Sequence, residues 1–143
     1  MKRLLTFALL LALSIPMLAE RVDQQKAAKV AETVLKNKEL TPVSMEPFNN
    51  LYVFNSEHGF VMVAAEDCVR PVLAYSTEFP FKTENMPMNI QSWLVSLNNE
   101  IQEAVDLKLE TTEAVRQEWE LLSQGICRCR SRLCRHCRKR SDC

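Results

Sequence analysis

Closely spaced cysteines are the residues of this chain best suited to chemistry. The chain has 143 residues and six cysteines, five of which lie in the segment 126–143. Together with the histidine of that segment they are Cys127, Cys129, Cys134, His136, Cys137 and Cys143. The first four cysteines form two pairs, and two such pairs can hold a tetrahedral zinc ion. Against zinc, only four residues separate the pairs, and seven Lys and Arg side chains crowd the segment.

The segment 126–143 has three other interpretations, which stay open. Thiols of an exported chain meet oxidising conditions and pair as disulfides, which would give a disulfide-linked or surface-binding tail. An arginine-rich arm can bind nucleic acid by neutralising phosphates. The composition also changes abruptly after Gly125, as it would at an out-of-frame or degenerate end without a selected role. We predict a disordered basic tail, with neither a metal site nor a cofactor.

Outside that tail, His58 and Cys68 are the remaining histidine and cysteine. A nucleophilic pair needs its thiolate within hydrogen-bond reach of the base. The two residues lie at opposite ends of an expected strand, Phe60–Ala65. At about 3.3 Å per residue, that strand separates them by roughly 20 Å. They therefore do not predict a cysteine protease site.

The carboxylates of Glu66 and Asp67 are also adjacent in the sequence. Neighbouring residues in extended backbone point to opposite faces, so we expect a solvated turn here and not an acid–base pair. The chain has only two glycines and therefore no glycine-rich phosphate loop. These patterns together predict that the chain is not an enzyme.

Three expected strands organise the rest of the chain. Leu51–Asn55 and Phe60–Ala65 are rich in Val, Phe and Tyr. Between them, Ser56–Gly59 has the length of a hairpin turn and ends in a glycine, which tolerates positive φ. A third run, Val72–Tyr75, begins directly after a proline. The predicted topology is an antiparallel meander.

One helix precedes this meander. Residues 20–38 have an amphipathic pattern with Asp23 as the N-cap. Ala27 and Ala31 give the helix a small-residue face that can lie close to a sheet. The connector that follows carries prolines, so it has at most a short edge strand near Val43–Met45.

Two more helices follow the meander. The first is capped by Asn89 and runs to about Leu107, with Trp93 as the largest available core anchor. The second starts at residues 111–112 and ends at Gly125. The predicted fold class is α+β: an antiparallel meander packed with one N-terminal helix and two C-terminal helices, in about two layers.

Residues 1–19 have the pattern of a secretory signal peptide, with two cations, an apolar run and a small residue at Ala19. The apolar stretch that ends at Leu18 has fifteen residues, whereas a spanning helix needs about 20. We predict a secreted or periplasmic protein without a stable membrane span.

Charge divides the remaining chain into two parts. Residues 20–125 contain 9 Lys and Arg against 17 Asp and Glu, whereas residues 126–143 contain 7 against 1. An acidic body argues against nucleic acid as its ligand. We therefore treat residues 20–125 as the folded domain and residues 126–143 as a separate tail.

Several short motifs of the body occur together in a known family. They are Ala27–Ala31 (AAKVA), Gly59–Asp67 (GFVMVAAED), Pro71–Ser76 (PVLAYS) and Asn85–Asn89 (NMPMN). With the intervening sequence they span about residues 22–124. This stretch resembles the propeptide of streptopain-like cysteine proteases and the stand-alone Spi-type protease inhibitors related to it.

The resemblance implies an antiparallel sheet with helices that occludes the active site of a cysteine protease. In the proteases a catalytic domain follows this point, where the present chain has its cysteine-rich tail. We predict an inhibitor that acts in trans on a streptopain-like cysteine protease. Two alternatives remain: a truncated protease precursor that retains only signal peptide and propeptide, and a structural or adhesion module that uses the tail.

The protease contact is expected at loops that end the strands. A domain of this size can present about 800 Å² to a partner. Loop 77–89 is apolar for a loop, so its side chains either pack inward or engage another protein. The candidate contact residues are Asn55, Glu57, His58, Phe79, Phe81, Met86, Met88 and Asn89.

Overall fold

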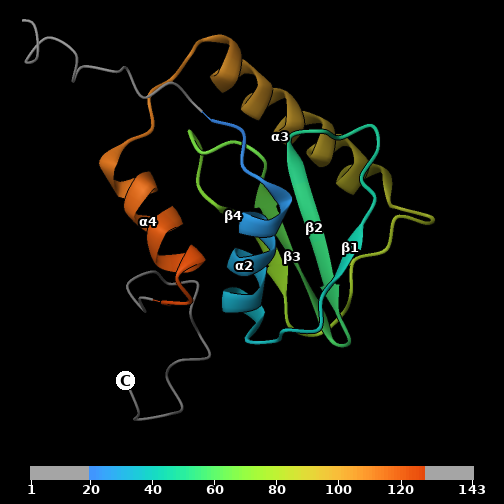
Figure 1. Cartoon of the computed structure of the whole chain (residues 1–143). Coiled ribbons are helices and arrows are strands. Elements are labelled where there is room, and N and C mark those ends of the chain that lie inside the picture. The colour runs from blue at the N-terminus through green and yellow to red at the C-terminus, as the bar shows by residue number, and fades with distance from the viewer. Residues whose placement is uncertain (1–19, 128–143) are drawn as a thin grey trace, which may run out of the picture.

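A computed structural model describes residues 20–127 of the chain (Figure 1). Its elements are α2 (Gln24–Leu35), β1 (Thr41–Val43), β2 (Leu51–Ser56), β3 (Gly59–Ala64), β4 (Val72–Ser76), α3 (Met88–Asp106) and α4 (Glu113–Ser123). The strands form one antiparallel sheet in the order β1-β2-β3-β4. The described chain is therefore an α+β meander with one helix before it and two after it, as predicted.

The predicted β2–β3 hairpin is present, but its turn is shorter than the expected Ser56–Gly59 and its glycine has a different role. Ser56 pairs with Gly59, so Glu57 and His58 form the turn. Gly125 is the glycine with positive φ in the described chain, and Gly59 is not. A Cβ on Gly59 would lie 2.3 Å from the backbone oxygen of Ser76. Glycine is needed there because β4 approaches closely.

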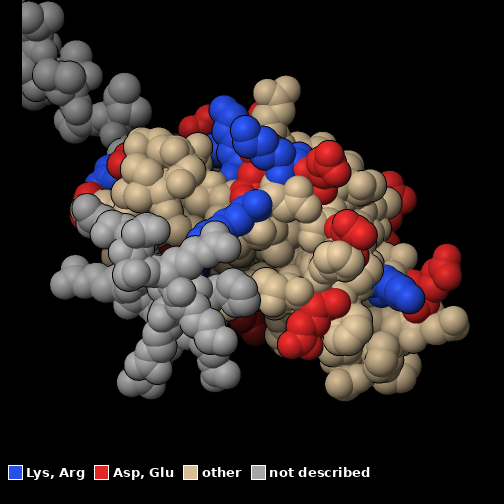
Figure 2. All heavy atoms as spheres, turned by 90° about the horizontal axis from the view of Figure 1, so that it is seen from below, with Lys and Arg blue, Asp and Glu red and all other residues tan. Residues whose placement is uncertain are grey.

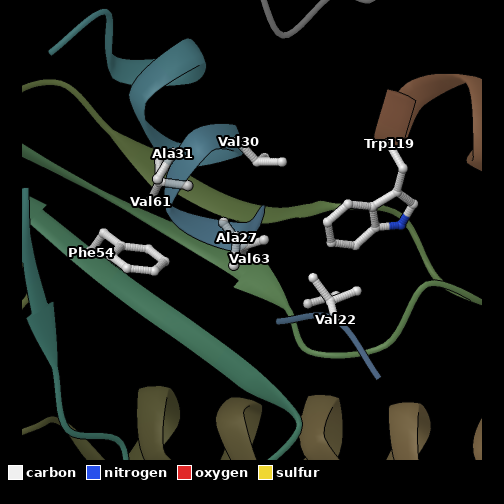
Figure 3. Close-up of a cluster of buried hydrophobic side chains, with 9 residues drawn as sticks. Val22, Ala27, Val30, Ala31, Phe54, Val61, Val63 and Trp119 are labelled. Carbon is white, nitrogen blue, oxygen red and sulfur yellow. The ribbon is translucent and has the colours of Figure 1, made fainter. Parts of the chain in front are cut away.

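One face of the sheet is covered by α2, which presents alanines to it. Ala27 and Ala31 are fully buried and pack in one cluster with Val61 and Val63 of β3 (Figure 3). Because these side chains are small, α2 approaches β2 and β3 to within 8 Å between Cα atoms. The small-residue face predicted for this helix is confirmed.

The other face of the sheet is covered by α3. Leu94 of this helix is fully buried in a second cluster with Met62 of β3, Val53 of β2 and Met45. In Figure 3, turns of α3 pass on the side of the sheet opposite α2. The chain therefore has three layers, and the prediction of about two layers was wrong, since β3 is apolar on both faces and needs a helix on each.

Two predictions for α3 need correction. Trp93 is 41% exposed and is not a core anchor, whereas Leu94 beside it is 0% exposed. Asn89 is not the N-cap, because the helix begins at Met88 with Pro87 before it. The carbonyl oxygen of Pro87 accepts hydrogen bonds from the backbone N–H groups of residues 90 and 91, so the first turn starts before Asn89.

The second tryptophan supplies the buried anchor from α4. Trp119 is 2% exposed in the cluster under α2, and its indole N–H donates to the backbone oxygen of Val69 at 2.9 Å. Lys26 of α2 places its Nζ 5.4 Å from the centre of the ring. Thr112 caps α4 by accepting the backbone N–H of Val115, as the sequence indicated.

Within residues 20–127, no helix has both the length and the apolar character to cross a membrane.

The correction for α3 yields a direct test with neighbouring residues. We expect Leu94→Ala to lower the free energy of unfolding by about 2–5 kcal/mol, because it leaves a cavity in a buried cluster. Trp93→Ala should lower it by about 1 kcal/mol or less, since much of that ring is exposed. Urea unfolding followed by circular dichroism measures both, and a larger loss for Trp93→Ala would contradict the orientation of α3.

Candidate functional site

The candidate site lies at the end of the sheet where three segments meet. These segments are the turn of the β2–β3 hairpin, the end of β4 and the loop that leaves β4. Phe60 pairs with Ser76 in the sheet, and a Cβ on Gly59 would lie 3.1 Å from the Cα atom of Thr77. Segments about 17 residues apart in the sequence are thus held side by side by strand pairing.

Asn55 fastens the loop to the sheet through both halves of its amide. Its Nδ2 donates to the backbone oxygen of Phe81 at 2.8 Å, and its Oδ1 accepts the backbone N–H of Phe81 at 2.9 Å. The ring of Phe81 also packs on Phe60 with 5.3 Å between ring centres. The amide of Asn55, predicted as a contact residue, is therefore engaged inside the chain.

Ser76 fastens the loop at its other end. Its Oγ accepts the backbone N–H groups of Glu78 and Phe79 at 3.2 and 3.4 Å. A serine hydroxyl that satisfies amides two and three residues ahead closes a local turn. Between the two fastened points, the side chain of Phe79 is 70% exposed.

The other predicted contact residues divide into exposed and packed ones. Glu57 and His58 are exposed at the tip of the hairpin, with 3.5 Å between their side chains. Met86 is partly buried against the cluster under α3, like Phe81. Met88 and Asn89 are exposed in the first turn of α3.

The structure thus brings Asn55, Phe79 and Phe81 together beside the exposed hairpin tip. Sequence reasoning missed Gly59 and Ser76, which fix the start of the loop. The signal for Ser76 was a hydroxyl at the last residue of a strand, whereas nothing local indicated the partner of Asn55, 26 residues away. Figure 2 views this end of the molecule and shows a largely uncharged surface broken by separate charged groups.

Glu66 and Asp67 lie at the opposite end of β3 and do not form a solvated turn. Glu66 is 6% exposed, and its Oε1 lies 3.4 Å from Nη1 of Arg21. Backbone hydrogen bonds of Val22 to Ala65 and of Asp67 to Glu20 place the N-terminal segment alongside them. The prediction failed because the covering segment is more than 40 residues away in the sequence.

Burial raises the pKa of Glu66 above its ordinary value of 4.5. The positive charge of Arg21 opposes this shift, and the negative charge of Asp67 adds to it. The pKa of the Cys68 thiol is also raised, first by burial and then by the charges of Asp67 and Glu66. A thiol of this kind is a weak nucleophile at neutral pH.

Neither a nucleophilic pair nor a metal site forms in the described part of the chain. His58 and Cys68 lie beyond opposite ends of β3. Between residues 20 and 127, no three His, Cys, Asp or Glu side chains converge as metal ligands. Cys127 lies near α2, with its Sγ 3.5 Å from the backbone oxygen of Thr33, and the remaining tail cysteines lie outside the described residues.

The Spi protease inhibitor family matches residues 19–101, which include the whole sheet and most of α3. The chain belongs to the Spi protease inhibitor family. The resemblance seen in the sequence is therefore confirmed.

One curated relative is itself a protease. The chain is 28% identical over 134 residues to the thiol protease/hemagglutinin PrtT of Porphyromonas gingivalis. The similarity takes in 82% of this chain and 15% of the relative, so the chain spans a small part of the relative's length. No solved structure matches the chain.

The raised pKa of Glu66 predicts how stability changes with pH. The folded chain holds the Glu66 proton more tightly than the unfolded chain does, so this group adds stability as pH falls through the folded pKa towards 4.5. Glu66→Gln should lack this gain, so the stability of wild type relative to Glu66→Gln should rise as pH falls from neutral towards 4.5, where the protonated carboxyl resembles the neutral amide of Gln. Urea unfolding across this range measures it, with Glu57→Gln on the exposed turn as control. Parallel curves for wild type and Glu66→Gln would contradict the burial of the carboxyl.

Proposed function

We propose that this chain inhibits a streptopain-like cysteine protease by covering its active site with the end of the sheet that carries Phe79. Membership of the Spi protease inhibitor family supports inhibition, and similarity to a thiol protease supports the class of enzyme. The observation that carries the proposal is the exposed ring of Phe79 on a loop fastened on both sides.

An exposed aromatic ring at a fixed position suits a binding anchor. Interfaces draw most of their affinity from a few buried aromatic or arginine side chains that fill pockets on the partner. The surrounding face needs to supply about 800 Å² of complementary surface, which the hairpin tip and loop 77–87 can share. Glu57 and His58 would then contribute to the rim of the contact.

The proposed role requires binding and no chemistry by the chain itself. Cys68 has a raised pKa and lies at the far end of β3 from His58, so the two cannot act as thiolate and base. We propose that the chain is a non-enzymatic inhibitor that acts in trans.

Inhibition is tested by titrating the purified protein into an active streptopain-like protease and following hydrolysis of a fluorogenic peptide. We expect stoichiometric or nanomolar loss of activity. Phe79→Ala should raise the inhibition constant about 30-fold, because truncating an interface anchor costs about 2 kcal/mol or more.

Leu107→Ala is the matched control. Leu107 is 63% exposed but lies at the far end of α3, so its loss should leave the inhibition constant unchanged. No inhibition by folded wild-type protein at micromolar concentration, against several such proteases, would overturn the proposed function.

We also propose export, with residues 1–19 removed as a signal peptide, residues 20–125 as the inhibitory domain and residues 126–143 as a basic tail. The protein would then act in the periplasm or outside the cell. The backbone nitrogen of Glu20 lies 2.8 Å from Oδ1 of Asp67. Cleavage after Ala19 would turn this amide into an ammonium group and make the hydrogen bond charge-assisted.

Processing can be tested on the exported protein. N-terminal sequencing should find Glu20 first. Asp67→Asn should destabilise the processed protein by up to about 1 kcal/mol more than the unprocessed one, because only the processed form carries the charged amine. Cleavage at another position, or equal effects in both forms, would contradict this account.

A further inference from the structure

We infer that residues 76–81 form a preorganised, cleavage-resistant plug whose anchor, Phe79, fits a protease with an apolar subsite for an aromatic side chain. This inference rests on the proposed function and adds the kind of subsite and the residues that position the anchor. Asn55 and Ser76 are positioning residues in it.

Preorganisation follows from where the loop is fastened. The hydroxyl of Ser76 accepts the backbone N–H groups of Glu78 and Phe79. The side-chain amide of Asn55 makes hydrogen bonds with both the N–H and the carbonyl oxygen of Phe81. The backbone on either side of the anchor is thus fixed while the ring itself is 70% exposed. A loop that is ordered before binding loses less conformational entropy on binding, which strengthens the complex.

Proline adds a constraint at the anchor itself. Pro80 follows Phe79 and has a fixed φ and no N–H. The residue before a proline is disfavoured in helical backbone, so Pro80 narrows the conformations open to Phe79. The backbone of the anchor is therefore restricted before any partner binds.

The same features protect the two peptide bonds that follow the anchor. The nitrogen of the Phe79–Pro80 bond belongs to proline and is a tertiary amide. The nitrogen of the Pro80–Phe81 bond carries the N–H that donates to Asn55 at 2.9 Å. A protease could not move this bond into its catalytic centre without breaking both hydrogen bonds of Asn55. The anchor can therefore occupy a subsite while the chain stays intact.

The test compares two asparagines that each tie β2 to another segment. Asn55 lies at one end of the strand, and Asn50, next to the other end, donates its side-chain N–H groups to the backbone oxygen of Asn98 and to Gln102, each at 3.1 Å. Each substitution removes two amide hydrogen bonds, so Asn50→Ala controls for loss of stability alone. Both proteins are incubated with an active streptopain-like protease well below their melting temperatures.

We expect the Asn55→Ala substitution to raise the inhibition constant at least tenfold. Mass spectrometry should show that the protease cuts the Asn55→Ala protein between residues 76 and 82. Asn50→Ala should inhibit like wild type and stay intact. Pro80→Ala should have an initial inhibition constant within threefold of the wild-type value, but the protease should cut it after Phe79. This variant tests the plug even if Asn55→Ala does not fold.

The outcomes separate this inference from the proposed function. If wild type inhibits, and Asn55→Ala and Pro80→Ala are equally potent and also stay intact, the plug is overturned. The proposed inhibitory function would then still stand. Wild type that does not inhibit would overturn the proposed function and the plug with it. A loss of potency in Asn50→Ala as large as in Asn55→Ala would show that stability, and not loop order, sets the affinity.

Discussion

Strand β3 is apolar on both faces, and the architecture depends on covering both. Val61 and Val63 face α2, whereas Met62 between them faces α3. The alanines of α2 bring that helix close, while the longer side chains under α3 fill a wider space. A slip of one residue would exchange the side chains that pack against α2 with those that pack against α3, so packing on both faces specifies the register that positions the hairpin and the end of β4. The candidate site inherits this rigidity from the core.

The candidate site is therefore a surface whose position is fixed by the sheet. Its exposed ring, Phe79, is surrounded by residues whose polar groups are satisfied within the chain, above all Asn55 and Ser76. Such an arrangement suits recognition of a rigid partner, because little order has to be gained on binding. Membership of the Spi protease inhibitor family indicates that this partner is a protease.

The sequence allowed the strands, the helices and their order to be predicted, because alternation, helical spacing and turn residues are local signals. Prediction failed where contacts with residues distant in the sequence determine whether a side chain is buried or engaged. Glu66 is buried by a segment more than 40 residues away, and Asn55 is engaged by Phe81. The exposed tryptophan was the wrong anchor because Trp93 and Leu94 differ by one position on the helix, and periodicity alone did not fix which of them faces the sheet. Phe79 and Asn55 were among the predicted contacts, but Ser76 and the role of Asn55 in holding the loop were not.

The central claim is that the end of the sheet covers the active site of a cysteine protease. The most direct measurement is the rate at which a small alkylating agent modifies the catalytic cysteine of a streptopain-like protease, with and without this protein. Our account predicts that one equivalent of wild-type protein suppresses alkylation and that Phe79→Ala at the same concentration protects much less. Full alkylation at the unprotected rate in a mixture where the two proteins are shown to be bound would contradict it, because binding would then leave the active site open.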